Sequence, residues 1–126
     1  MGQIIAIMIG GAFGVVSRYG VSHFVYILAG RGFPYGTLAV NVLGSFLMGY
    51  LSIYLLAKVS FDPAIRFAIL VGFLGSFTTF STFSIDTLTL LESGLVGKAF
   101  TNIAISVTAS LGALWLGVTL ARAMKF

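Results

Sequence analysis

The sequence predicts an all-α membrane protein with four transmembrane helices, the third of them broken. Hydrophobic residues make up 59% of the 126 residues and charged residues only 8%, whereas soluble domains carry about 25% charged residues. The mean hydropathy is +1.10. Four apolar stretches have the roughly 17 to 25 residues that a spanning helix needs. We therefore expect a single four-span transmembrane domain over residues 1–126, embedded in a lipid bilayer.

The spans are expected at about residues 3–29, 35–58, 64–92 and 98–124. Asp62 followed by Pro63 is a signal for the start of the third span. No Lys or Arg precedes the first apolar run, and it is longer than a signal-peptide core, so we expect it to stay in the protein. The absence of cysteine excludes disulfides and thiolate metal sites, and with one His and three carboxylates we expect neither an enzyme nor a nucleic-acid partner.

The third span has a polar centre. Of the ten residues from Gly75 to Ser84, six are Ser or Thr. Glycine and hydroxyl residues are poor helix formers, which predicts a helix break near residues 75–79. Backbone groups freed inside a membrane must be satisfied by protein, water or an ion. The break therefore predicts a functional site, and Phe80 and Phe83 fall on one helical face just beyond it.

Three polar residues within the spans admit more than one interpretation. Arg18 either reaches an interface and neighbouring carbonyls, or sets a positive field for an anion. Asn41 either joins two helices or binds something that passes through the membrane. Asp86, close to the end of the third span, is a candidate for a carboxylate at a watery mouth.

Small and hydroxylated residues also form stripes at helical spacing. Each polar stripe is either a helix-packing face or a wall of a polar path. The stripe of three glycines in the first span favours close contact with another helix. The residues concerned are Thr37, Asn41 and Ser45 in the second span, Asn102, Ser106 and Ser110 in the fourth, and Gly10, Gly11 and Gly14 in the first.

The loop charges predict a weak preference for orientation. Lys58, Arg66, Arg122 and Lys125 lie on the side of both termini, whereas Arg31 and Lys98 lie on the other side. Because this positive-inside bias is shallow, the chain could insert in both directions. Four short spans enclose little volume, so we expect an antiparallel two-fold homodimer.

Three motifs, in order and at matching spacing, carry a resemblance to a known family. They are GGAFG at residues 10–14 leading to Arg18-Tyr19, GTLAVNVLGSF at 36–46, and GFLGSFTTFSTF at 72–83. The chain closely resembles the CrcB/Fluc family of small dual-topology fluoride ion channels along nearly its whole length. The fourth span matches only in polarity and small-residue content.

The resemblance implies an antiparallel homodimer with two fluoride pathways that passively exports fluoride from the cytoplasm across the cell (inner or plasma) membrane. Phe80 and Phe83 would line each path, with Asn41 nearby. A structural Na⁺ at the dimer centre would be bound by backbone carbonyls at Gly75 and Thr78. The remaining pathway candidates are Thr37, Ser81, Thr82, Ser84, Ser106 and Ser110.

Two other classes of function stay open at this stage. A small dual-topology proton-coupled exporter of organic cations would share the size and the charge bias, but it would need Asp86 as its titratable carboxylate. A helical subunit of a larger complex would use Asn41 and the glycine faces for packing only.

Overall fold

The computed structural model describes residues 1–58 and 60–124. Val59, Lys125 and Phe126 lie outside the described residues. Lys125 is one of the four cations predicted to lie on the side of the termini. Four helical stretches are long and apolar enough to cross a membrane, namely Gly2–Ala29, Tyr35–Ala57, Pro63–Glu92 and Val96–Ala123. Their ends lie within two residues of the predicted ones. The prediction of an all-α protein with four candidate spans is therefore confirmed.

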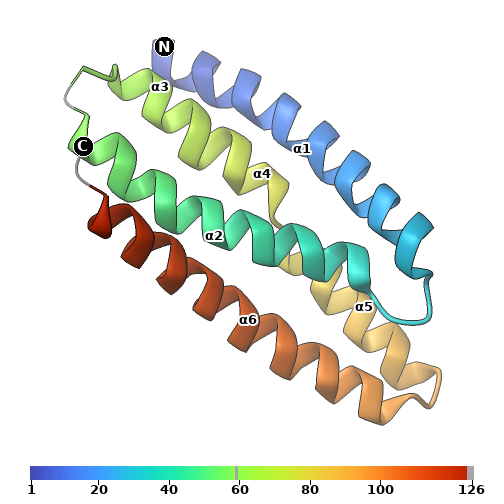
Figure 1. The fold of residues 1–126 in the computed structure, drawn as a ribbon. Coiled ribbons are helices and arrows are strands. Elements are labelled where there is room, and N and C mark those ends of the chain that lie inside the picture. Colours follow the sequence, from blue (N-terminus) through green and yellow to red (C-terminus); the bar gives the residue numbers. More distant parts are fainter. Residues whose placement is uncertain (59, 125–126) are drawn as a thin grey trace.

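Three of the spans are continuous helices and the third is divided (Figure 1). The continuous helices are α1 (Gly2–Ala29), α2 (Tyr35–Ala57) and α6 (Val96–Ala123). The third span consists of α3 (Pro63–Phe67), η1 (Ala68–Leu74), α4 (Gly75–Phe77) and α5 (Phe80–Glu92). η1 is a π-helical segment, whereas the sequence predicts an ordinary helix up to the break. Such segments are rare and occur often near functional sites.

The connections follow the predicted signals. Asp62 caps α3, because the Ala64 backbone N–H donates to its carboxylate at 2.8 Å and Pro63 occupies the first helical position. Gly30 and Gly94 follow the ends of α1 and α5 with φ of 81° and 79°, a conformation that favours glycine. Both termini and the α2–α3 connection lie at one end of the bundle, and the other two connections lie at the opposite end (Figure 1).

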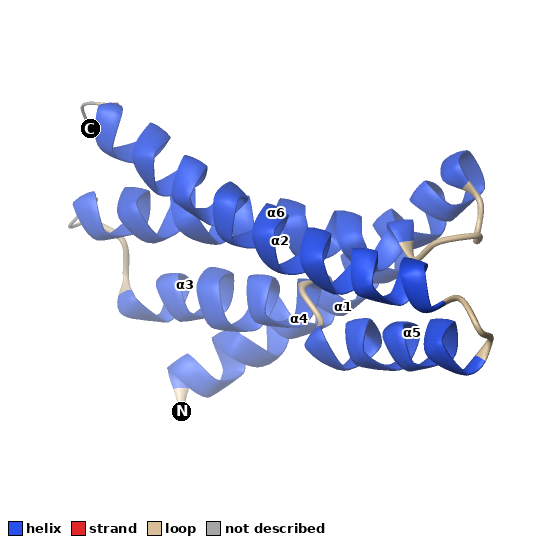
Figure 2. Ribbon diagram, turned by 90° about the horizontal axis from the view of Figure 1, so that it is seen from below, coloured by secondary structure: helices blue, strands red, loops and turns tan. Residues whose placement is uncertain are grey.

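The bundle is held together in two halves, in which α2 packs mainly against α6 and α1 packs mainly against η1 (Figure 2). Glycines make both contacts possible. A Cβ atom at Gly14 would collide with the Phe73 carbonyl, and one at Gly117 would collide with the Phe46 carbonyl. The predicted close-contact face of the first span is thus confirmed, and it receives η1.

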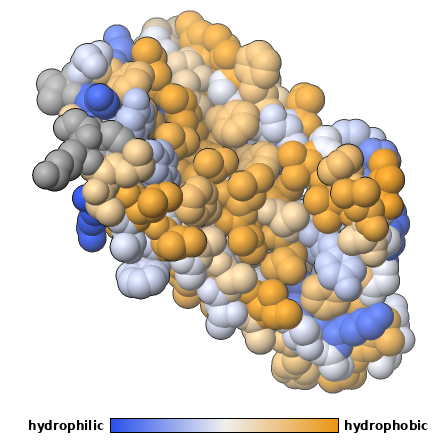
Figure 3. Space-filling model, viewed as in Figure 1, coloured by the Kyte–Doolittle hydropathy of each residue, from blue (hydrophilic) through white to orange (hydrophobic). Residues whose placement is uncertain are grey.

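Most large apolar side chains face outward. Figure 3 shows hydrophobic residues across the middle of the molecule and hydrophilic residues toward both ends. Trp115 is 69% exposed and Phe80 is 77% exposed, whereas Val40 and Leu74 are fully buried. Exposed apolar surface of this kind is covered by lipid or by another protein chain in a membrane.

Candidate functional site

The helix break lies at Thr78 and Thr79, whose backbones are extended with φ and ψ of −87° and 157°, and −152° and 119°. The predicted break begins earlier, at Gly75. In the structure Gly75 is helical, with φ −61° and ψ −33°, because a glycine lowers helix stability without forbidding the conformation. The break is therefore confirmed within the predicted range, but Gly75 precedes it.

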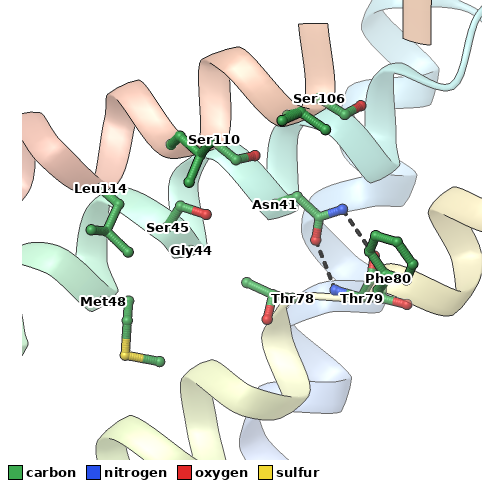
Figure 4. A pocket seen from close by; sticks show the side chains of 12 residues that line it. Asn41, Gly44, Ser45, Met48, Thr78, Thr79, Phe80, Ser106, Ser110 and Leu114 are labelled. Carbon is green, nitrogen blue, oxygen red and sulfur yellow. Dashed lines mark hydrogen bonds between the residues drawn. The ribbon is translucent and has the colours of Figure 1, made fainter. Parts of the chain in front are cut away.

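Asn41 from α2 binds both backbone groups of Thr79. Its Nδ2 donates to the Thr79 carbonyl at 2.9 Å, and the Thr79 N–H donates to its Oδ1 at 2.7 Å (Figure 4). Thr79 is 8% exposed, so unpaired backbone groups there would be costly. Asn41 thus joins α2 to the third span, which is one of the two interpretations that its sequence position allowed. Its amide carries a second N–H, which this pair leaves unused.

The Thr79 side chain caps the helix that follows the break. Its Oγ1 accepts a hydrogen bond from the Thr82 backbone N–H at 3.1 Å, donates to Thr82 Oγ1 at 3.0 Å and lies 3.3 Å from Ser81 Oγ. This is the usual role of a threonine at a helix N-terminus. The hydroxyls of Ser81 and Thr82 are therefore gathered around the break.

A cavity of about 400 Å³ opens beside the break and is lined by α2, by α6 and by residues of the break itself (Figure 4). It contains five of the residues predicted from the sequence, namely Asn41, Thr78, Phe80, Ser106 and Ser110. Ser45 also lines it, as its shared face with Asn41 indicated, while Met48, Leu111 and Leu114 add apolar walls that the sequence did not single out. The residues that line this cavity carry no charge.

Phe80 and Phe83 lie together but in different surroundings. Their ring centroids are 5.3 Å apart and the rings are inclined by 47°. Phe80 borders the cavity and is 77% exposed, whereas Phe83 is 9% exposed and does not line it. Within one chain, therefore, only the first of the two predicted rings reaches the cavity.

A buried chain of hydrogen bonds joins α5 to α6. Asn102 Nδ2 donates to Thr87 Oγ1 at 3.0 Å, and Ser106 Oγ donates to Asn102 Oδ1 at 3.2 Å. Thr87 in turn donates to the Phe83 carbonyl at 2.8 Å. The stripe predicted on the fourth span is thus a helix-packing contact at Asn102 and a cavity wall at Ser106 and Ser110. Because Ser106 has one hydroxyl proton, it must rotate away from Asn102 to donate into the cavity.

A second polar cavity, of about 230 Å³, lies on the other side of the break, against α1. Arg18, Thr37 and Thr82 line it, so three more predicted residues lie together. Arg18 is half-buried and faces hydroxyl groups. Thr37 also donates to Asp86 Oδ2 at 2.7 Å. That contact places the half-buried Asp86 against α2, where it lines a third cavity with Arg31 and Tyr26 near the α1–α2 connection.

Ser81 and Ser84 are not brought to a described cavity. Both are exposed on α5, and the Ser84 hydroxyl donates to the Phe80 carbonyl at 2.9 Å. Within a single chain they face outward, so their predicted place on a hydroxyl track is untested.

The break also bears on the predicted cation. No group of three or more His, Cys, Asp or Glu side chains within residues 1–58 and 60–124 could hold a metal ion. Backbone oxygens are the remaining ligands. The Thr79 N–H is bound to Asn41, so the carbonyl of Gly75 lacks its usual helical donor four residues later. Carbonyls at the end of such a half-helix suit Na⁺, and the residues present fit that ion.

Comparison with known proteins gives concordant results. The family described as CrcB-like protein, Camphor Resistance (CrcB), matches residues 5–118. A protein named fluoride-specific ion channel FluC from Methylococcus capsulatus is 49% identical over 120 residues, which are 95% of this chain and 53% of that protein. The chain therefore spans about half the length of that relative.

Two relatives match from end to end. Fluoride-specific ion channel FluC proteins from Citrifermentans bemidjiense and from Geobacter sp. strain M21 are each 47% identical over 124 residues, which are 98% of this chain and 100% of each relative. These names are those of ion channels and not of enzymes, as expected from the sequence. With residues 5–118 matched and identities near one half, the chain belongs to the CrcB family.

Proposed function

We propose that this protein is a fluoride-selective ion channel that passively exports fluoride from the cytoplasm. The observation that carries the proposal is the uncharged cavity at the helix break, where an amide, hydroxyls and a phenyl ring meet in a chain whose relatives are named fluoride-specific ion channels. A narrow path lined by neutral donors can replace part of an ion's hydration shell. It also releases the ion, because no fixed charge holds it.

The donors available to fluoride follow from the hydrogen bonds. Asn41 keeps one amide N–H after binding Thr79. The Ser110 hydroxyl forms no hydrogen bond within the described part of the chain, and it lines the same cavity. Ser106 joins them when its hydroxyl turns away from Asn102. Thr82 and Ser81 continue the proposed hydroxyl track along α5, and Arg18 supplies a positive field beside it. Thr37 and Ser84 join the track when their hydroxyls turn away from Asp86 and from the Phe80 carbonyl.

The phenyl rings contribute through their edges. An aromatic ring is negative on its face and positive at its edge, so an edge favours an anion and a face favours a cation. Phe80 stands beside the cavity with most of its ring exposed, and Phe83 lies behind it. We propose that fluoride passes along these edges. The negative-inside membrane potential of the inner or plasma membrane would drive the anion outward without a coupling ion.

We further propose that two chains in opposite orientations form the functional unit and enclose two pathways. Phe80, Ser81 and Ser84 are exposed in a single chain, and the cavity beside Asn41 is an open groove, so a second copy is needed to close the path. The shallow charge bias of the loops allows both orientations. A two-fold axis then produces the same pathway twice.

We propose that Na⁺ lies at the centre of this dimer as a structural ion. The Gly75 and Thr78 carbonyls of both chains would hold it, and it would supply a fixed positive charge between the two third spans. Gly75 is exposed, and a Cβ atom added there would meet only the Leu70 carbonyl oxygen, at 4.0 Å, among the described residues, so a second chain could approach it closely.

Fluoride efflux from liposomes that contain the purified protein tests the function. We expect rapid fluoride efflux after valinomycin addition in a potassium gradient, with little chloride efflux under the same conditions. Replacing Phe80 by Ile should slow fluoride efflux by about tenfold or less, because ring-edge contacts contribute about 0.5 to 1.5 kcal/mol. A fluoride electrode and a chloride electrode provide the measurements.

Phe100→Ile is the matched control, because Phe100 is 64% exposed on α6 and lines none of the cavities described above. It should conduct like the wild type. Equal chloride and fluoride efflux would contradict the proposed selectivity. If Phe80→Ile and Phe83→Ile both conducted like the control, the proposed role of the rings would be wrong.

Substitution of Asn41 tests the hydrogen-bond pair at the break. Asn41→Ala removes both bonds to Thr79, leaves two buried groups unpaired at about 1 to 3 kcal/mol each, and should lower both the melting temperature and fluoride efflux. Asn41→Asp keeps the acceptor for the Thr79 N–H but turns a carboxylate oxygen toward the Thr79 carbonyl and adds a negative charge to the cavity, so it should abolish efflux and also lower the melting temperature.

Ser52→Ala is the control for this pair, since among the described residues the Ser52 hydroxyl bonds only to the Gly49 carbonyl of the same helix. It should change neither quantity. Wild-type melting and wild-type efflux in Asn41→Ala would exclude any role of Asn41 in holding the break.

Labelling of single cysteines tests the opposite orientations, and the absence of native cysteine makes each label specific. Ser60→Cys and Ser93→Cys lie in exposed connections at opposite ends of the bundle. A membrane-impermeant maleimide should label about half of the molecules of each variant in intact cells, because both orientations are expected. Full labelling of one variant with none of the other would show a single orientation and rule out the antiparallel dimer.

The proposed ion is tested by thermal unfolding in detergent. The melting temperature should be several degrees higher in NaCl than in choline chloride at equal ionic strength, because an ion that binds only the folded dimer stabilises it by mass action. Equal melting temperatures in the two salts over a wide range of concentration would argue against a structural Na⁺.

A further inference from the structure

Arg66 lies near the start of the third span, at the end of the bundle that carries both termini (Figure 1). It is half-buried, and its Nη2 donates to the Lys58 carbonyl at 3.1 Å. Its Nε is buried without a hydrogen-bond partner. An arginine has five N–H donors, so most of this guanidinium's capacity is unused by the described residues. The other N–H groups of this half-buried cation can bind an acceptor that the described residues do not provide.

The same arginine stands at one end of an apolar groove of about 290 Å³. Its other lining residues are Pro63, Phe67, Leu70 and Val71, which follow one face of α3 and η1 at helical spacing. Phe67 is 40% exposed and Val71 is 51% exposed. The opposite face of η1 is the one that packs against α1, through Gly72 and Ile7. The groove therefore opens away from the rest of the chain.

The charges around the groove select an anion as its polar occupant. Lys58 is a second cation at this end of the bundle, and its ammonium lies 5.8 Å from the centroid of the Tyr54 ring. The nearest acidic residue in sequence, Asp62, uses its carboxylate to cap α3 at Ala64. A guanidinium binds a phosphate through two parallel hydrogen bonds, which an ammonium does not match.

We propose that this groove binds an anionic phospholipid, with its phosphate on the Arg66 guanidinium and an acyl chain along Phe67, Leu70 and Val71. Arg66 lies three residues, or about 4 to 5 Å along the helix axis, from Pro63 at the start of the span, so its long side chain can reach back to a lipid phosphate at the membrane surface. The acyl chain covers the exposed apolar side chains below it. The lipid would thus hold the start of the third span at a fixed depth in the membrane.

The test uses native mass spectrometry of the purified protein with phosphatidylglycerol or phosphatidylcholine as the added lipid. The wild type should retain phosphatidylglycerol in preference to phosphatidylcholine. Arg66→Gln should weaken phosphatidylglycerol binding by about tenfold, since charge-assisted bidentate pairs are among the stronger hydrogen-bonded contacts, and Arg66→Lys should weaken it less. Unchanged binding in Arg66→Gln would overturn the proposal.

A second variant keeps the test independent of the charge. Val71→Phe fills the groove without altering Arg66, and it should lower the affinity for phosphatidylglycerol. Arg122→Gln is the matched control, because Arg122 is exposed in the last turn of α6 at the same end of the bundle and outside the groove. It should bind the lipid like the wild type.

Two further results would refute a lipid site. If inorganic phosphate displaced phosphatidylglycerol completely at millimolar concentration, Arg66 would be a site for a free anion. If Val71→Cys were cross-linked to the same position of a second copy by a short thiol reagent, the groove would be a contact between chains. None of these measurements involves fluoride, so the inference stands or fails separately from the proposed channel function.

Discussion

The two hydrogen bonds between Asn41 and Thr79 are the contact on which the rest of the site depends. A helix interrupted inside a membrane exposes backbone groups that no lipid can satisfy. One amide side chain satisfies both groups of Thr79. It thereby allows α5 to start again at Phe80 with Thr79 as its cap. The break residues held in this way, Thr78, Thr79 and Phe80, form the side of the cavity that faces α2 and α6.

The position of Asn41 depends in turn on close packing between backbones. Glycines let α1 approach η1 and let α2 approach α6, and side chains there would collide with carbonyl groups. Gly44 has a similar role at the break, because an added Cβ would collide with the Thr78 methyl group. In lipid, such packing replaces the hydrophobic effect as the main source of helix association. The cavity is therefore the space left between two tightly packed helix pairs.

The polar side chains of the site serve stability and function together. Ser106 gives its one proton to Asn102, which bonds Thr87, so a residue of the proposed path also holds α5 against α6. A buried donor without a partner is costly. A hydroxyl that exchanges a protein acceptor for a passing anion stays satisfied in both states, and this makes neutral donors suited to a path that ions enter and leave.

The sequence by itself determined the class of the protein, the four spans and the presence of a break, because apolar length and runs of Gly, Ser and Thr are local properties. It also indicated most of the polar side chains of the cavity, since Asn41 and Ser45, or Ser106 and Ser110, share faces by helical spacing alone. Only the tertiary structure decided that the break starts at Thr78 and not at Gly75, that η1 is a π-helix and that Phe83 is buried. These features depend on Asn41, on the glycines of α1 and on packing between spans far apart in the chain, and such long-range contacts leave no local pattern in the sequence.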